Sequence, residues 1–178
     1  MKRIGLFIFV FLLNIAAYAQ WRITPTGGLV DATSGKEYMV IQKEGSQEEL
    51  YKSILKNAHR IFIHPDDVVS FVENEMISIT GYGETTMKYG LLNHQLNPKI
   101  CVKIEFKQGK MRVQAAWVDV LWANTSKVAP YTFLSKGGLK CFNKTGEVSN
   151  KGRFDTYNDV SNAFINNILF PKSENEDW

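Results

Sequence analysis

Histidine and aspartate residues near position 64 are the first candidates for chemistry in this chain of 178 residues. His64 is followed by Asp66 and Asp67, and a histidine beside carboxylates is the composition of many hydrolytic sites. His59 lies five residues earlier, which is not the i, i+4 spacing of a metal-binding pair on a helix. Pro65 and the two aspartates are also typical of an exposed turn, which we favour. We therefore assign no catalytic residue and no metal site.

The two cysteines, Cys101 and Cys141, allow one intramolecular disulfide. In an oxidising compartment such a pair can form a bond, but sequence distance does not show that the two side chains meet. The alternative is two unpaired thiols, one on a strand and one in a loop. Both possibilities stay open from the sequence.

A Gly-Tyr-Gly sequence at positions 81–83 invites comparison with a phosphate-binding loop. No helix start follows it to supply backbone amides, and Lys88 lies too far along the chain to complete such a loop. Glycines at the end of a strand more often mark a bulge or a close approach of another element. We expect this second role, and we expect no cofactor.

The first nineteen residues have the three parts of a secretory signal peptide. Lys2 and Arg3 form a basic head, positions 4–17 are almost continuously apolar, and Ala-Tyr-Ala at 17–19 carries small residues where a signal peptidase reads them. The apolar run is shorter than the roughly 20 residues of a spanning helix. We therefore expect residues 1–19 to be removed and the protein to be exported, to the periplasm or outside the cell, with no transmembrane segment.

Export changes the charge balance of the chain. The full sequence has 21 Lys and Arg residues against 18 Asp and Glu residues, and removal of Lys2 and Arg3 lowers only the first number, by two. The mature protein is then nearly neutral and lacks the basic footprint that phosphate-driven binding of nucleic acid needs. The expected partners are an envelope protein or a small molecule, and no nucleic acid.

The predicted order of elements is one strand, one helix, four strands and a second helix. Ser46 and Glu49 have the spacing of a capping box, and apolar residues recur at helical spacing between Leu50 and Phe62. The second helix is expected from Thr156 to Phe170. Alternation and turn residues predict strands at 37–42, 68–72, 76–82, 100–107 and 111–117.

These elements predict one α+β domain over residues 37–172. An antiparallel sheet of about five strands, with both helices packed on one face, is the simplest way to bury the apolar sides. Residues 20–36 are expected to be an irregular lead-in, and residues 173–178 an acidic tail. Residues 121–153 are expected to form an insertion with short strands or a flap.

The insertion and the strand before it are rich in aromatic residues, which suggests a ligand site. Aromatic side chains over a few convergent polar groups are how many small-molecule pockets are built. Large aromatics also complete ordinary cores, and we favour this second interpretation. The predicted polar face carries Ser78, Thr80, Tyr82, Arg112 and Gln114, and its predicted roof carries Trp117, Trp122, Tyr131, Phe133 and Phe142.

Three blocks of sequence carry a likeness to a known family: 45–51 (Gly-Ser-Gln-Glu-Glu-Leu-Tyr), 77–85 (Ile-Ser-Ile-Thr-Gly-Tyr-Gly-Glu-Thr) and 104–112 (Ile-Glu-Phe-Lys-Gln-Gly-Lys-Met-Arg). In these blocks the chain resembles the exported bacterial family of domains of unknown function numbered 4468. The likeness runs from Tyr38 to about Val120. It implies a TBP-like fold and no established activity. DNA binding does not follow from it, because a fold does not define a function.

The leading functional hypothesis is an exported cell-envelope protein without catalytic activity, which acts through binding or assembly. One alternative is a carrier of a small, partly apolar ligand held between the sheet and residues 121–153. Another is a hydrolase that uses His64 with Asp66 or Asp67. A carrier needs an enclosed apolar cavity, a hydrolase needs His and Asp in a cleft, and an assembly module needs an exposed apolar patch or an open sheet edge.

Overall fold

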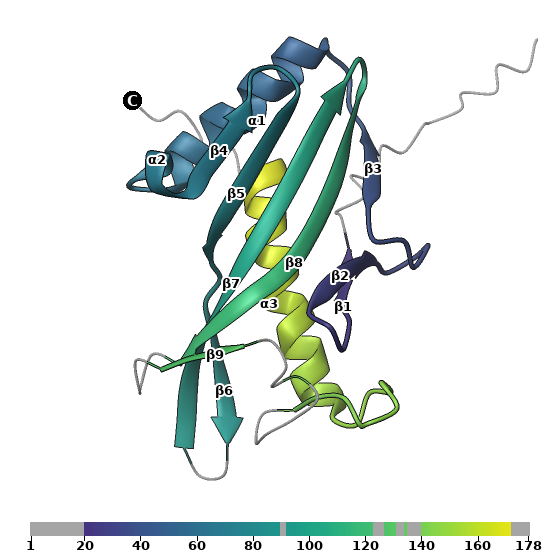
Figure 1. Cartoon of the computed structure of the whole chain (residues 1–178), viewed down its shortest axis with the longest axis vertical. Coiled ribbons are helices and arrows are strands. Elements are labelled where there is room, and N and C mark those ends of the chain that lie inside the picture. Colours follow the sequence, from purple (N-terminus) through teal and green to yellow (C-terminus); the bar gives the residue numbers. More distant parts are fainter. Residues whose placement is uncertain (1–19, 90–91, 123–126, 131–133, 135–139, 172–178) are drawn as a thin grey trace, which may run out of the picture.

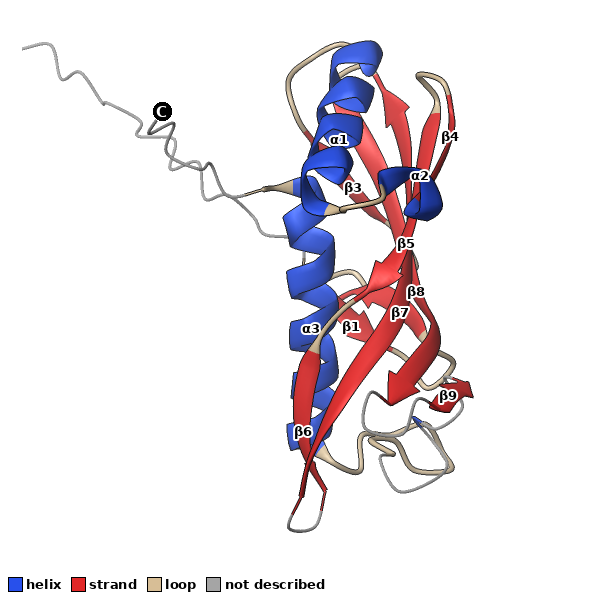
Figure 2. Ribbon diagram, turned by 90° about the vertical axis from the view of Figure 1, so that its left-hand side faces the viewer, coloured by secondary structure: helices blue, strands red, loops and turns tan. Residues whose placement is uncertain are grey.

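The computed structural model describes residues 20–89, 92–122, 127–130, 134 and 140–171. The signal peptide predicted at 1–19 and the acidic tail predicted at 173–178 lie outside these ranges. In the described residues, one antiparallel sheet carries two long helices on one of its faces, so the expected α+β class is confirmed (Figures 1 and 2). The sheet has nine strands in this part of the chain rather than about five, because short strands flank a long central pair.

The central pair is the hairpin of β7 (Leu92–Lys107) and β8 (Lys110–Trp122). Every second residue of β7 from Ile100 to Phe106 is buried, as the alternating sequence predicted. Gly109, with a φ of 71°, makes the tight turn between the two strands. Both strands extend beyond the ends expected from the sequence, and their register shifts next to Lys99.

Shorter strands extend the sheet on both sides of this hairpin. They are β1 (Trp21–Ile23), β2 (Gly28–Asp31), β3 (Met39–Gln42), β4 (Val69–Val72), β5 (Met76–Tyr82), β6 (Thr85–Tyr89) and β9 (Lys127–Pro130). Along β7 lie β5 and β6, and along β8 lie β3, β2 and β9. The longest path through the sheet is β1-β2-β8-β7-β5-β4, so β1 and β4 are its two end strands.

Residues 20–36 are not the irregular lead-in that the sequence predicted. They contain the β1–β2 hairpin, which joins the sheet where Leu29 pairs with Ala115. Three and four residues are too few for an alternating pattern to stand out beside neighbouring Thr and Gly residues. Trp21, Ile23 and Leu29 are at most 2% exposed, so the domain includes residues before position 37.

Helix α1 (Gln47–Ile61) begins as the sequence predicted. The Ser46 hydroxyl accepts a hydrogen bond from the Glu49 amide at 3.1 Å, and the Glu49 carboxylate accepts one from the Ser46 amide at 2.7 Å. This reciprocal pair is a capping box. The hydrogen bond from the Ser46 amide is the main cause that holds the pKa of Glu49 below its ordinary value. The turn expected at Pro65 is a single helical turn, α2 (Pro65–Val68).

Helix α3 (Lys151–Leu169) begins at Lys151 rather than at Thr156. Its N-cap is Asn150, whose side-chain oxygen accepts a hydrogen bond from the Arg153 amide at 3.1 Å. The first three residues of α3 are Lys, Gly and Arg, so apolar spacing could not show this start. The expected insertion at 121–153 is therefore divided among the end of β8, β9, the following segments and the first residues of α3.

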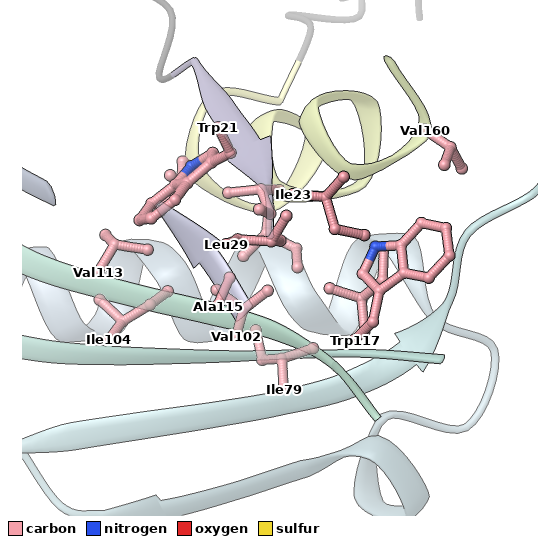
Figure 3. Packing of buried hydrophobic residues seen from close by; sticks show 14 of the residues in the cluster. Trp21, Ile23, Leu29, Ile79, Val102, Ile104, Val113, Ala115, Trp117 and Val160 are labelled. Atoms are coloured by element: carbon pink, nitrogen blue, oxygen red, sulfur yellow. The ribbon is translucent and has the colours of Figure 1, made fainter. Parts of the chain in front are cut away.

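The core lies between the two long helices and the sheet, and no helix covers the opposite face in the described ranges (Figure 2). Figure 3 shows Trp21, Ile23 and Leu29 of the β1–β2 hairpin between α3 and the central strands. Helix α1 lies against β5, β7 and β8. The two helices thus cover one face between them, as the sequence predicted.

Gly81 and Gly83 let α3 lie close to the sheet. A Cβ atom at Gly83 would lie 2.8 Å from Val160 Cγ2, and one at Gly81 would lie 3.0 Å from ring atoms of Phe62 and Phe164. A larger side chain at either position would move packed neighbours. The close approach expected from the sequence is confirmed.

Candidate functional site

The five polar residues that the sequence grouped together lie on the face of the sheet without helices. Ser78, Thr80 and Tyr82 alternate with the buried residues of β5, and Arg112 and Gln114 alternate with those of β8. The strand registers place Ser78 and Gln114 on either side of the same β7 residue. We call this surface, formed by the outward side chains of β3, β4, β5, β7 and β8, the open face. Ligand binding by these residues stays a prediction.

A cluster of charges lies on the open face near the turn of the β7–β8 hairpin. Glu105 of β7 lies 3.1 Å from Lys103 Nζ and also pairs with the guanidinium of Arg112 on β8. The hydrogen bond from Lys103, with a further one from Arg112, holds the pKa of the Glu105 carboxyl below its ordinary value. Arg112 also lies over the Tyr38 ring, 6.0 Å from its centroid. These contacts hold three long charged side chains in place.

The open face carries an excess of basic residues. On the described outward positions of β7 and β8, the acidic residues are Glu105 and Asp119. Lys107 and Lys110 pair across the end of the hairpin, beside a shallow hollow of about 200 Å³ that Val40 also lines. The basic residues on these positions are Lys99, Lys103, Lys107, Lys110 and Arg112.

For Trp117 and Phe142 the favoured interpretation as core residues is confirmed, and the alternative of a roof over this face is wrong for these two residues. Trp117 faces the helices, where its ring nitrogen donates a hydrogen bond to Ser161 Oγ at 2.8 Å and its ring centroid lies 5.2 Å from that of Tyr157. Phe142 is buried and contacts Phe154 of α3. These two aromatics complete the core. Tyr131, Phe133 and the side chain of Trp122 are not among the described parts of the chain.

Cys101 and Cys141 are free thiols, so the disulfide that the sequence left open is not formed in this structure. Cys101 lies on the open face, with its Sγ 3.6 Å from Ser78 Oγ. Cys141 is buried in the core on the other side of the sheet. Burial raises the pKa of the Cys141 thiol to about 12, which keeps it protonated and unreactive at neutral pH.

His64, Asp66 and Asp67 are exposed at the start of α2. His64 is the N-cap residue of this single turn, but its side chain makes no capping hydrogen bond. Three exposed side chains on one surface turn do not form the cleft that a hydrolase needs. In the described ranges, no group of three His, Cys, Asp or Glu residues is placed to hold a metal ion.

Sequence reasoning missed a row of asparagines on α3 that binds the end strand β1. Asn158 Oδ1 accepts a hydrogen bond from the Ile23 amide at 2.9 Å. Asn162 Oδ1 accepts one from the Trp21 amide at 2.7 Å, and its Nδ2 donates to the Trp21 carbonyl at 3.0 Å. We call Asn158 and Asn162 the asparagine row, and it takes the place of a neighbouring strand. Its sequence signal was asparagine at positions one helical turn apart.

The fold defines an α+β class in which helices cover one face of a curved antiparallel sheet. The chain is similar to the solved structure of a DUF4468 family protein from Bacteroides ovatus, with a TM-score of 0.52, 14% identity, and coverage of 80% of this chain and 82% of that chain. A TBP-like protein from Parabacteroides distasonis gives a TM-score of 0.49 and 12% identity, over 74% of this chain and 85% of that chain.

No family model matches the sequence, and no curated protein does. The likeness to the Bacteroides ovatus structure agrees with the fold that the sequence resemblance implied. At this identity it shows the fold alone. Among the described residues, no helix has the length and apolar character to cross a membrane.

Proposed function

We propose that this chain is an exported binding module of the cell envelope, which docks an acidic protein surface on its open face. The observation that carries the proposal is the open face itself. It is a broad sheet surface without a covering helix in the described ranges, and basic side chains outnumber acidic ones on β7 and β8. Complementary charge speeds encounter with an acidic partner and disfavours basic ones.

The composition of the open face supports docking of a protein. Tyr82 is 49% exposed and Val40 is 46% exposed, and they offer apolar area on either side of the charge cluster. Tyr and Arg are the side chain types enriched at the centres of protein interfaces. Because Glu105 already holds Lys103 and Arg112, binding orders fewer side chains and loses less conformational entropy.

The signal-peptide pattern of residues 1–19 supports export. The positions of the aromatic side chains bear on the choice between protein docking and the carrier function. We do not propose the carrier function, because Trp117 and Phe142 face the core and, among the described residues, no aromatic from 121–153 covers the polar face. We do not propose the hydrolase either, since His64 and its neighbouring aspartates are exposed on a surface turn.

Export is tested by the intact mass of the protein recovered from the periplasm or the medium of a host that secretes it. The expected mass is that of a chain beginning at Gln20, which is the first residue after the leader. Recovery of the uncleaved chain from the cytoplasm would contradict export and leave the docking test unaffected.

Docking is tested by titration of isotopically labelled protein with poly-L-glutamate as an acidic probe. Backbone amide shifts should concentrate on β7 and β8. The double variant Lys107→Glu, Lys110→Glu should weaken binding about tenfold or more. The matched control, Lys140→Glu with Lys144→Glu, changes two exposed lysines in another segment and should bind as the parent does. Equal weakening in both variants would contradict docking on the open face.

A further inference from the structure

Strand β4 ends the sheet beyond β5, and no described element pairs with its outer side. The pairing with β5 runs from Val69 opposite Ile79 to Val72 opposite Met76. Figure 2 views the molecule from this side, with α1 toward the helix face and α2 at the start of the strand. Backbone amides and carbonyls along the outer side of β4 are therefore turned away from the sheet.

The sequence of β4 lacks the residue types that protect many edge strands. Natural edges are protected by the shortness of the strand, by lysine or proline, or by an inward-pointing charge. Strand β4 is short, with four residues, but Val69–Val72 (Val-Ser-Phe-Val) contains no lysine, proline or charge. Phe71 is 56% exposed and Val72 is 48% exposed. β-branched and aromatic residues of this kind favour pairing with a further strand.

Acidic residues lie at both ends of this strand, and they oppose pairing with a second copy of the chain. Two copies related by a two-fold axis would pair their β4 strands in the antiparallel direction. The acids before β4 of one copy would then face the acids after β4 of the other, and like charges disfavour that contact. The same charges favour a strand with basic ends. The exposed acids are Asp66 and Asp67 before the strand and Glu73 and Glu75 after it.

A hollow of about 400 Å³ lies at the far end of β4, next to Glu75. A lysine or arginine side chain suits it, because the apolar stem can pack on the apolar lining while the charged group reaches a carboxylate. Glu105 already pairs with Lys103 and Arg112, which leaves Glu75 as the main acceptor. The lining is Gln47, Val72, Glu75, Met76, Glu105, Phe106 and Lys107.

We propose that β4 is a strand-addition site, which takes up an extended segment of a partner protein with β-branched residues at its centre and Lys or Arg at each end. Backbone hydrogen bonds along β4 hold the segment, and the acidic ends determine which segments are accepted. The backbone edge of β4 is distinct from the open face, but the hollow beside Glu75 shares Glu105 and Lys107 with it. Strand addition is therefore tested on the amides of β4 and on Glu73 and Glu75, none of which the open-face variants change.

Two blocked peptides test the site, Lys-Lys-Val-Thr-Val-Thr-Lys-Lys and the same sequence with Glu in place of every Lys. Each is titrated into isotopically labelled protein while backbone amides are followed. The lysine peptide should shift the amides of β4 and give cross-strand proton contacts to Val69–Val72. The glutamate peptide should bind at least about tenfold more weakly.

Two double variants separate the acidic ends from general charge. Glu73→Gln with Glu75→Gln should weaken the lysine peptide about tenfold. Glu37→Gln with Asp159→Asn removes two exposed acids elsewhere and should leave its affinity unchanged. Equal binding of both peptides, or shifts on the open face alone, would overturn the proposal. Shifts of β4 that depend on protein concentration without peptide would assign this edge to a second copy, and would overturn it as well.

Discussion

The end strands β1 and β4 each have one side that no other strand of the described sheet pairs with. At β1, the asparagine row of α3 binds the amides of Trp21 and Ile23, and both of these side chains are buried. At β4, half-exposed Phe71 and Val72 border a side with no such partner. The same sheet is therefore protected against further pairing at one end and able to accept a strand at the other.

Removal of one aromatic side chain from each end strand should give the largest contrast. Trp21→Ala should lower the free energy of unfolding by about 3–5 kcal/mol, because it leaves a cavity between α3 and the sheet. Phe71→Ala should lower it by about 1 kcal/mol, because Phe71 is half exposed and its main aromatic contact is the edge of Tyr51, with centroids 6.3 Å apart. Urea unfolding measures both values. Equal losses would show that β4 is packed as firmly as β1.

Removal of the asparagine row should have the next largest effect. Asn158→Ala with Asn162→Ala leaves two part-buried backbone amides without their acceptors, which should cost about 2–4 kcal/mol. Hydrogen exchange of the Trp21 and Ile23 amides should become at least about tenfold faster. Asn167→Ala, an exposed asparagine on the same helix, is the control and should change stability by less than about 0.5 kcal/mol. Unchanged exchange of the Trp21 and Ile23 amides in the double variant would show that the asparagine row does not protect β1.

Substitutions of the N-cap residues of the two long helices form a matched pair whose expected effects on stability are smaller. Ser46→Ala breaks a reciprocal capping box on α1, which lies beside β4, and Asn150→Ala removes one capping bond from α3, which holds β1. Each should cost about 0.5–2 kcal/mol, with the larger loss at Ser46. Only Asn150→Ala should speed exchange of the Trp21 amide. Faster exchange there in Ser46→Ala would show that the two ends of the sheet are coupled.

The smallest effect at neutral pH concerns Cys141, whose carbonyl accepts hydrogen bonds from the amides that precede α3. Burial raises the pKa of this thiol from 9.0 to about 12. The folded protein therefore holds the proton more tightly than the unfolded chain, so this stabilisation is complete below pH 9.0 and is lost as pH rises toward about 12.

Thermal melts between neutral and alkaline pH measure this dependence. Cys141→Ala should flatten the alkaline fall in melting temperature. The slope is the quantity to compare, because the Ala substitution at a buried position also removes packing. Equal slopes in the variant and the parent would contradict a buried, protonated thiol at Cys141.

The sequence predicted those parts of the fold in which a local signal is repeated. Residues 100–107 and 111–117 alternate over several residues, and the capping box at Ser46 has a defined spacing, so the central hairpin and α1 were found. The β1–β2 hairpin and the start of α3 were missed because each depends on few residues. The position of the β1–β2 hairpin is set by contacts with segments more than a hundred residues away, such as Trp21 with Asn162, and the start of α3 is set by one cap residue, Asn150.

The candidate site followed the same pattern. Alternation along β5 and β8 was enough to place Ser78 and Gln114 on one face. Alternation cannot tell which face another part of the chain covers, so the sequence left a roof open as an alternative for Trp117, although the core was favoured and is confirmed. The exposure of β4 depends on the order of strands in space, which the order along the chain does not give.

The asparagine row also limits how long β1 can be. Side chains one turn apart on a helix advance by about 6.0 Å, as four steps of about 1.5 Å, whereas every second residue of a strand advances by about 6.8 Å. The two spacings drift apart by roughly 0.8 Å at each contact, and a hydrogen bond tolerates only a few tenths of an ångström. A helix can therefore imitate a strand for only about two contacts, and the two contacts at Trp21 and Ile23 span the three residues of β1. The shortness of β1 therefore reflects the difference between the spacing of side chains one turn apart on a helix and the spacing of every second residue on a strand.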